Sequence, residues 1–227
     1  MKQRKHLTRH EVEQILLATE QGKHFERDYC LIKMCFIHGL RVSELCGLKL
    51  SDIDLDGRAI FIRRLKNSLS TMHPLFDDEI QGLLRWLNVR RGWRDADSDW
   101  LFLSQKGGPL TRQQVRRLLV QYGSETNISV RPHPHMLRHG CGFALADLGK
   151  DTRLIQDYLG HKNIRHTVLY TAINTQRFVN VWGGKVGENV TNKDQSGKRG
   201  IFAGIRGTYR VKRGFFTNAW RIASKKG

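Results

Sequence analysis

One short stretch of strand-forming residues interrupts a chain whose other periodic segments have helical spacing. Ala59 to Arg63 has the β-branched, aromatic and apolar content that is typical of a strand. The stretch from Leu65 to Leu75 is expected to form a turn and a return strand, with Lys66 in the turn. These features predict a mainly α-helical chain with one small antiparallel β-sheet, an α+β fold.

Helix caps and helix breaks divide the rest of the chain into short helices. Thr8 followed by Glu11 has capping-box spacing, and Thr111 followed by Gln114 repeats it. Ser43 is expected to cap a short helix that follows a break at residue 39. The helices that we expect run from Arg9 to Thr19, Tyr29 to Ile37, Ser43 to Leu45, Asp77 to Val89, Thr111 to Tyr122, Pro134 to Gly149, Thr152 to Gly160 and Arg165 to Trp182.

The composition of the chain changes after Trp182. Residues 183–227 hold nine glycines and eleven Lys or Arg residues, but only two acidic residues, Glu188 and Asp194. A basic, Gly-rich and weakly periodic stretch is typical of a tail that stays flexible until it meets an anion. We therefore expect one folded domain over residues 1–182 and a flexible basic tail over residues 183–227.

The net charge of the chain limits its partners. The chain has 39 Lys or Arg residues against 21 Asp or Glu residues, which gives +18 at pH 7 and attracts nucleic acid or anionic lipid. The longest apolar runs, such as Met34 to Ile37, are far shorter than the roughly 20 residues of a membrane span. The stretch from Met1 to Gln14 lacks the apolar core of a secretory signal. We therefore expect a cytoplasmic protein with no membrane partner.

The four cysteines do not indicate a disulfide framework or a metal site. They form no C-x-x-C pair and have no regular spacing. Free cysteine is among the most buried residue types. We therefore interpret all four as reduced core residues, namely Cys30, Cys35, Cys46 and Cys141.

Two arginines lie in sequence contexts that suit phosphate binding. Arg41 lies in the stretch HGLRVSEL, and Arg138 lies in HMLRH, three residues after His135. A guanidinium donates two parallel hydrogen bonds to one phosphate and stays charged at any working pH. Residues three apart are neighbours on one helix face, so His135 and Arg138 are expected to lie together. By itself, an H-x-x-R pair in a basic protein is more often a solvated surface pair.

A third motif changes the interpretation of these arginines. Leu159-Gly160-His161 is followed nine residues later by Tyr170, within the stretch TVLYT. The ordered set G-L-R-x-S-E-L, H-x-x-R-H, L-G-H and Y-T resembles the tyrosine recombinase (phage integrase) family, and the likeness covers roughly Leu7 to Trp182. The stretches RRLKN, HPHMLRH and DTRLIQDYLGH are most similar to the small fimbrial phase-variation invertases.

The resemblance implies a tyrosine recombinase catalytic domain over residues 1–182 and roles for six side chains. Tyr170 would attack a DNA phosphate, form a 3′-phosphotyrosyl link and release a 5′-hydroxyl. Arg41 and Arg138 would stabilise the charge that develops on the phosphate oxygens. Because the covalent link stores the energy of the phosphate bond, rejoining needs no ATP, and the chain contains no G-x-x-x-x-G-K-[ST] loop.

The other three side chains would move protons or bind the phosphate. Lys66 would protonate the leaving oxygen. His135 would assist proton transfer from Tyr170, because a phenol with an unperturbed pKa of about 10 is mostly protonated at neutral pH. His161 would hydrogen-bond a non-bridging oxygen. Side chains supply every cation in this scheme, so the resemblance implies no cofactor and no metal.

The histidines near Arg138 also allow a zinc interpretation. His135 and His139 are spaced i and i+4, and His133 lies close by in the sequence. A zinc site needs three or four ligands and a satisfied second shell. No carboxylate accompanies these histidines as it does in H-E-x-x-H, so we do not favour a metal site.

Two other classes of function remain open. A non-catalytic DNA-binding transcription regulator would use the short helices around Ser43 and Thr152 for recognition, which explains the charge but not the ordered Arg, His, Arg, His and Tyr set. A type IB topoisomerase-like nicking and closing enzyme would share the chemistry but relax DNA without exchanging strands between partners. Tyr122 and Tyr158 lack the sequence context of Tyr170, so we interpret them as structural.

The resemblance also predicts the partners of the protein. Most relatives carry an additional N-terminal DNA-clamping domain, whereas Arg41 here lies only forty residues from Met1. We therefore expect no separate N-terminal core-binding domain, and a need for accessory DNA-bending proteins or the basic tail to hold double-stranded DNA. The expected active unit is a homotetramer on two paired inverted repeats. It would invert a promoter segment and so switch fimbrial expression.

Overall fold

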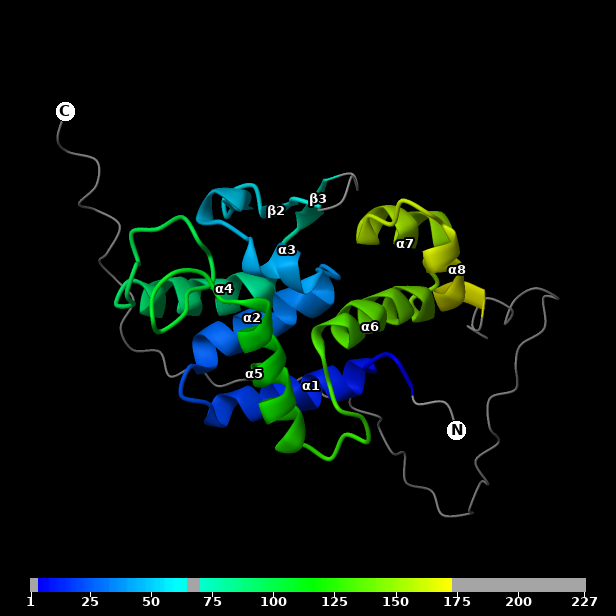
Figure 1. The fold of residues 1–227 in the computed structure, drawn as a ribbon. Helices are drawn as coiled ribbons and strands as arrows, with labels where there is room; N and C mark the ends of the chain where they lie inside the picture. The colour runs from blue at the N-terminus through cyan, green and yellow to red at the C-terminus, as the bar shows by residue number, and fades with distance from the viewer. Residues whose placement is uncertain (1–3, 65–69, 173–227) are drawn as a thin grey trace, which may run out of the picture. The chain divides into compact units, whose positions relative to one another are not determined.

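The computed structural model describes residues 4–64 and 70–172 and confirms the predicted fold class (Figure 1). Short helices make up most of the described chain, and three strands form one sheet. The helices are α1 (Arg9–Ala18), η1 (Thr19–Gln21), α2 (Phe25–Ile37), α3 (Val42–Cys46), η2 (Leu50–Asp52), α4 (Asp77–Arg90), α5 (Arg112–Ser124), α6 (Pro134–Asp147), α7 (Thr152–Leu159) and α8 (Arg165–Ala172). The predicted tail, residues 183–227, lies outside the described residues.

Three of the predicted helix starts are confirmed by side-chain caps. The Thr8 hydroxyl accepts from the backbone N–H of Glu11, and Thr111 makes the same contact with Gln114. Asp151 caps α7 through its carboxylate, which accepts from two backbone N–H groups in the first turn. In each case the side chain satisfies N–H groups that have no partner within the helix.

Two predicted helix starts differ from the structure, and one predicted helix end is not tested by it. Helix α2 begins at Phe25, four residues before Tyr29, because its first turn is polar and carries little hydrophobic periodicity. Ser43 does not cap α3: Arg41 occupies the N-cap position and donates its backbone N–H to Glu44 Oε2 at 2.9 Å. The predicted continuation of the last helix to Trp182 lies outside the described residues.

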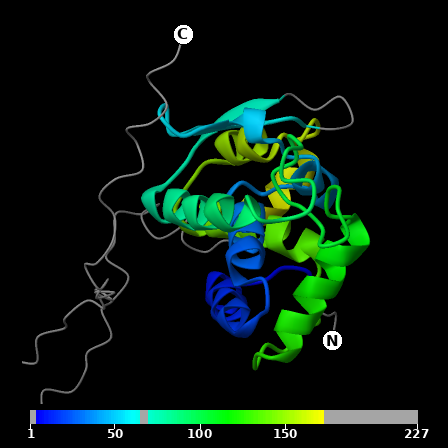
Figure 2. The same cartoon turned by 90° about the vertical axis from the view of Figure 1, so that its left-hand side faces the viewer.

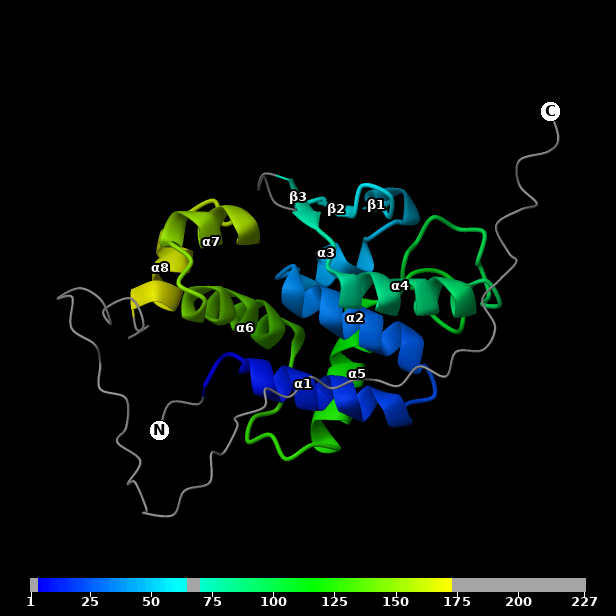
Figure 3. The ribbon, with the colours of Figure 1, turned by 180° about the vertical axis from the view of Figure 1, so that it is seen from behind.

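The strands form an antiparallel sheet in the order β1 (Ile53–Asp54), β2 (Ala59–Ile62) and β3 (Thr71–Pro74). Ile60 and Ile62 alternate along β2 and enter the core, as expected for a sheet with one buried face. Figure 3 shows the sheet above α3. Lys66, which was predicted to lie in a turn between two strands, is outside the described residues.

Two hydrophobic clusters hold the described chain together. The larger cluster is built around α2, which packs against α1, α4 and α6, and it contains the fully buried Trp86. The sheet and α1 lie on opposite sides of α2, as two perpendicular views show (Figures 1 and 2). The smaller cluster joins α6, α7 and α8, and its members are Cys141, Ala146, Ile155, Leu159 and Tyr170. Tyr170 is therefore a core residue of this second cluster.

A glycine allows the turn after α2 to approach the end of α7. Gly39 has φ +56°, in the left-handed region that favours glycine. A Cβ atom at this position would lie 2.3 Å from Leu159 Cδ2 and 3.2 Å from Cys141 Sγ. The end of α2 and the end of α7 can therefore meet only when residue 39 has no side chain.

A buried arginine far from this crossing stabilises the loop after α4. The guanidinium of Arg90 donates to the backbone carbonyls of Trp100, Leu101, Ala96 and Ser98 at distances of 2.6–3.2 Å. Its role is structural, because these hydrogen bonds hold a long loop whose backbone groups are not paired within a helix or the sheet.

The cysteine prediction is confirmed with one difference. All four thiols are free, and three of them are buried, whereas Cys46 is half-buried. Burial raises the pKa of each thiol, so the thiols stay protonated and act as small apolar groups. No helix in the described part of the chain is long and apolar enough to cross a membrane.

Candidate active site

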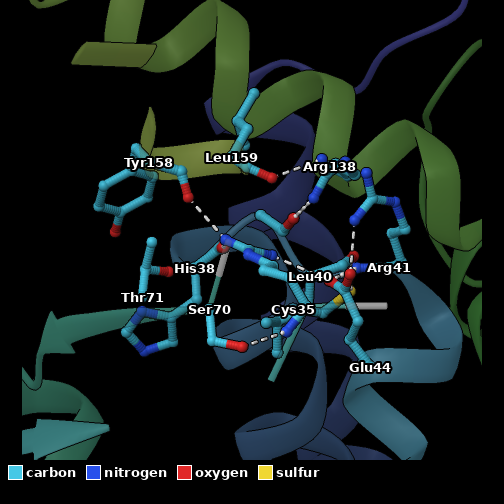
Figure 4. Close-up of polar contacts among 12 residues, drawn as sticks. Cys35, His38, Leu40, Arg41, Glu44, Ser70, Thr71, Arg138, Tyr158 and Leu159 are labelled. Carbon is cyan, nitrogen blue, oxygen red and sulfur yellow. Dashed lines mark hydrogen bonds and ion pairs between the residues drawn. The ribbon is translucent and has the colours of Figure 1, made fainter. Parts of the chain in front are cut away.

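Arg41 lies where the chain enters α3, directly after the turn at Gly39. Its guanidinium donates to Glu44 Oε1 at 2.6 Å, while Glu44 Oε2 accepts the Arg41 backbone N–H. The Arg41 side chain keeps 26% of its surface exposed, whereas that of Glu44 keeps 1%. Burial alone would raise the pKa of Glu44, but the hydrogen bond from Arg41 and the charge of Arg64 lower it below the ordinary value. Arg41 is thus fixed at its base and open to solvent (Figure 4).

Arg138 lies on α6 and is almost fully buried, with 3% of its surface exposed. Its guanidinium donates to the carbonyl of Gly39 and, at 2.7 Å, to the carbonyl of Leu159. These two oxygens lie at the ends of α2 and α7, which the glycine turn brings together. Burial, together with the charges of Arg41 and Arg64, lowers the pKa of Arg138 to about 10. The side chain still carries its charge at neutral pH.

Tyr170 lies on α8 with 1% of its surface exposed. Its hydroxyl is 2.9 Å from Nδ1 of His139, one residue after Arg138 on α6. The ring packs on Gly142, where a Cβ atom would lie 2.7 Å from it. Burial raises the pKa of the hydroxyl to about 12, against the charge of Arg138, which lowers it. The phenol is therefore protonated at neutral pH and held by a histidine.

Three histidines surround the arginines and the tyrosine. Burial, with the neighbouring positive charges, lowers the pKa of His139 to about 4 and that of His161 to about 3. Nδ1 of His161 lies 2.9 Å from the Thr167 hydroxyl, and its ring is stacked with that of Tyr170, with centroids 6.2 Å apart. His135 keeps an exposed surface. Partial burial of its ring and the charges of Arg138 and Arg41 lower its pKa. All three imidazoles are neutral at pH 7, so each offers one donor and one acceptor.

The combination of groups suits an anionic substrate with a transferable group. Two guanidiniums provide fixed positive charge, and neutral imidazoles beside a protonated phenol can accept and return its proton. Among residues 4–64 and 70–172, no group of three or more His, Cys, Asp or Glu side chains is placed to hold a metal ion.

The structure brings together five of the six residues that the sequence singled out, and Lys66 is outside the described part. Arg41, His135, Arg138, His161 and Tyr170 come from four separate segments of the chain. One contact differs from expectation: the Tyr170 hydroxyl bonds to His139, whereas the sequence analysis expected His135 to assist it. His135 lies one turn away, with its ring centroid 5.8 Å from that of His139.

Three residues of the site were not assigned a role from the sequence. Glu44 follows Arg41 by three residues, a helix-start spacing that would have indicated their contact. His139 shares a helix face with His135, but its neighbour Tyr170 is 31 residues away in the sequence. Arg64 bonds to Glu44 at 2.9 Å and to the carbonyl of Tyr158 at 2.6 Å, over separations of 20 and 94 residues. No local pattern indicates a contact over such a distance.

Comparisons with known proteins show which family the chain resembles. The pattern of the phage integrase family matches residues 5–177. The type 1 fimbriae regulatory protein FimB of Escherichia coli (strain K12) is 54% identical over 181 residues, covering 80% of this chain and 90% of that protein. FimE of the same strain is 50% identical over 183 residues, covering 80% and 92%.

Solved structures show the same fold. The crystal structure of XerA recombinase superposes with a TM-score of 0.68 at 28% identity, covering 78% of this chain and 63% of that chain. XerH site-specific recombinase, in a post-cleavage complex with a palindromic difH substrate, superposes with a TM-score of 0.66 at 26% identity, covering 78% and 52%. The chain thus spans less than two thirds of these recombinases. It belongs to the phage integrase family, as an enzyme of the tyrosine recombinase type.

The lowered histidine pKa values predict how stability depends on pH. In the unfolded chain a histidine titrates at its ordinary value of 6.5, whereas folded His139 titrates at about 4 and His161 at about 3. As the pH falls below 6.5 the unfolded state therefore binds protons first, and the free energy of unfolding decreases toward pH 4. Urea unfolding at a series of pH values measures this slope.

A matched pair of variants tests the origin of the slope. His139→Gln is expected to reduce the slope between pH 6.5 and 4, because it removes one group whose pKa is lowered by folding. His10→Gln, at an exposed position, is the control and should leave the slope unchanged. An equal slope in both variants would contradict the assignment of a neutral, buried His139.

Proposed function

We propose that this protein cleaves and rejoins double-stranded DNA through a 3′-phosphotyrosine link at Tyr170. One observation carries the proposal. The Tyr170 hydroxyl is bonded to the residue next to Arg138, while the Arg138 guanidinium is bonded to the turn that leads into Arg41. A nucleophile and two cations from distant segments thus meet around one site.

The proposed reaction is an exchange of two phosphate esters. The Tyr170 oxygen attacks the scissile phosphorus, the bond from phosphorus to the 5′-oxygen breaks, and the 5′-oxygen leaves with a proton. Arg41 and Arg138 stabilise the negative charge on the non-bridging oxygens, and His161 donates a hydrogen bond to one of them. Attack by a 5′-hydroxyl on the phosphotyrosine reverses each step, so no energy source is consumed.

Two proton transfers accompany the exchange. A phenol with a pKa of about 12 must lose its proton as it attacks, and the neutral imidazoles nearby can accept it. His135 is our candidate for assisting this transfer during attack, because the charges of both Arg138 and Arg41 act on it. His139 holds the hydroxyl in the DNA-free protein. Lys66 is our candidate for the acid that protonates the 5′-oxygen.

We further propose that the substrate is a pair of short inverted repeats. Similarity to FimB and FimE supports inversion of a promoter segment that controls fimbrial phase variation. Similarity to XerH bound to a palindromic substrate supports recognition of duplex DNA. In this proposal a homotetramer acts on the two repeats in the cytoplasm, with accessory DNA-bending proteins and the basic residues 183–227 holding the DNA.

The first test removes the nucleophile alone. Tyr170→Phe lacks the attacking oxygen, so covalent capture of a nicked duplex carrying the repeat should fall by more than about a thousandfold. DNA binding should remain within about threefold of wild type, because phosphate contacts dominate affinity. Gels that retain covalent protein–DNA complexes measure capture, and a mobility shift measures binding.

A second tyrosine provides the control for this test. Tyr122 is also buried, and its hydroxyl donates to Asp28 at 2.8 Å, far along the chain from the site. Tyr122→Phe is expected to lose about 1 kcal/mol of stability and no capture. Unchanged capture by Tyr170→Phe would favour the non-catalytic DNA-binding regulator.

The second test separates strand exchange from simple nicking and closing. A supercoiled plasmid carrying two inverted repeats is incubated with the protein, and restriction mapping scores the orientation of the segment between them. Inverted product is expected, because each phosphotyrosine can be attacked by a 5′-hydroxyl from the partner site. Relaxed plasmid without inversion would instead support the topoisomerase-like alternative.

The third test isolates the role of Lys66. Lys66→Ala should slow cleavage of an ordinary phosphodiester by about 100-fold or more, because an alkoxide leaves poorly without an acid. A substrate with sulfur in place of the bridging 5′-oxygen releases a thiolate, which needs no proton. The variant should therefore cleave this substrate almost as fast as wild type does. A defect of equal size on both substrates would show that Lys66 is not the acid.

A further inference from the structure

Arg64 is a buried cation that the proposed reaction does not use. It follows β2, two residues before Lys66, and its side chain has no exposed surface. Burial lowers the pKa of its guanidinium, while the charge of Glu44 raises it. Removing an ionised side chain from water is costly, so a buried arginine is retained only where its surroundings repay that cost.

The contacts of Arg64 run parallel to those of Arg138. Arg64 Nη2 donates to the carbonyl of Tyr158 at 2.6 Å, with a longer contact of 3.4 Å to the carbonyl of His38. Arg138 donates to the carbonyl of the residue that follows each of these two in the sequence, namely Leu159 and Gly39. The two guanidiniums therefore hold successive oxygens at the ends of α2 and α7. Figure 4 shows the carbonyls of Tyr158 and Leu159 beside each other, each with its own dashed contact.

Arg64 also neutralises the carboxylate that holds Arg41. Glu44 accepts from Arg64 Nη1 at 2.9 Å through Oε2 and from Arg41 Nη1 at 2.6 Å through Oε1. If Arg64 were uncharged, the negative charge of Glu44 would act more strongly on Arg41. The field of Arg41 at a bound phosphate would then be reduced, because the carboxylate and the phosphate compete for the same cation.

The fit around Arg64 is close enough to exclude a loose, solvated role. Gly160 has φ +63°, and a Cβ atom there would lie 3.0 Å from Arg64 Nε and 3.1 Å from Cγ. The chain that leads from α7 into His161 therefore packs directly on the Arg64 stem. A planar fork that serves a carboxylate and a carbonyl at once is a property of arginine and not of lysine.

We propose that Arg64 is a positioning residue of the recombinase site. Arg64 offsets the negative charge of Glu44, so that the positive charge of Arg41 is directed to the scissile phosphate. Arg64 also holds the end of α7 beside Arg138. The proposal rests on the function proposed above. It separates two roles for the cations of the site: Arg41 and Arg138 contact the phosphate, whereas Arg64 acts on the reaction through them.

The test compares the full-length wild type with Arg64→Met, which keeps the length of the side chain and removes its charge. The substrate is a nicked duplex carrying the repeat, with either an ordinary phosphate or a neutral methylphosphonate at the scissile position. Arg64→Met should bind DNA within about threefold of wild type but capture the phosphate substrate about 10- to 100-fold more slowly. On the methylphosphonate the defect should be at least about fivefold smaller, because that linkage carries no anionic charge for Arg41 to stabilise.

A second arm restores the balance of charge. Glu44→Gln added to Arg64→Met removes the carboxylate that Arg64 offsets, so the double variant should capture the phosphate substrate faster than Arg64→Met does. Glu44→Gln alone completes the cycle and gives the coupling between the two side chains. If Arg64→Met does not fold, Arg64→Gln takes its place with the same expectations.

Arg90 provides the control for general destabilisation. It is a buried arginine that donates to backbone carbonyls away from the site, so Arg90→Met should lower stability and change capture equally on the two linkages. The positioning role is wrong if folded Arg64→Met shows the same defect on both linkages, or if Glu44→Gln gives no recovery. If the wild type itself forms no covalent complex, the proposed function fails instead.

Discussion

The site depends on the meeting of two helix C-termini. The carbonyls of Tyr158 and Leu159 belong to the last turn of α7, where the helix carries a partial negative charge. Together with the carbonyls of the turn after α2, they converge on the guanidiniums of Arg138 and Arg64. These oxygens stabilise two buried cations, of which only Arg138 is proposed to contact the phosphate. Gly39 makes the approach possible, because a Cβ atom there would collide with Leu159. A backbone crossing therefore fixes where the charge of the site lies.

Burial and the same cations together set the protonation of the neighbouring side chains. Positive charge and burial act together on His139 and His161 and keep both imidazoles neutral, whereas on Tyr170 they oppose each other and burial dominates. The DNA-free site is therefore cationic at its arginines, anionic at Glu44, and neutral at the imidazoles of His139 and His161 and at the phenol of Tyr170. An incoming phosphate adds negative charge, which favours protonated imidazoles. In the proposed reaction, binding of the phosphate would thus prepare the histidines to take up the phenol proton.

The sequence predicted the parts of this structure that depend on local patterns. Caps at Thr8 and Thr111 and the strand-forming run after Ala59 are local signals, and each corresponds to an observed element. Membership of the family predicted Arg41, Arg138 and Tyr170 through motifs. The partner of the Tyr170 hydroxyl and the contacts of Arg64 could not be predicted, because they depend on how distant helix ends meet. Ser43 was expected to cap α3, because serine is a preferred cap residue. This expectation was wrong, since Arg41, which follows the turn at Gly39, occupies the N-cap position.

Tyr170 is both a core residue and the proposed nucleophile, and the architecture makes these two roles compatible. It belongs to a cluster of five buried residues that is separate from the large core around α2. A small cluster costs less to rearrange than a large one, since the free energy of burial scales with the apolar area removed from water. We infer that the hydroxyl can leave His139 and reach a phosphate through a rearrangement of α8 alone, because the end of α7 is held by Arg138 and Arg64. The arginines and the turn at Gly39 would stay fixed by the larger core, so the cations would hold the phosphate still while the nucleophile moves.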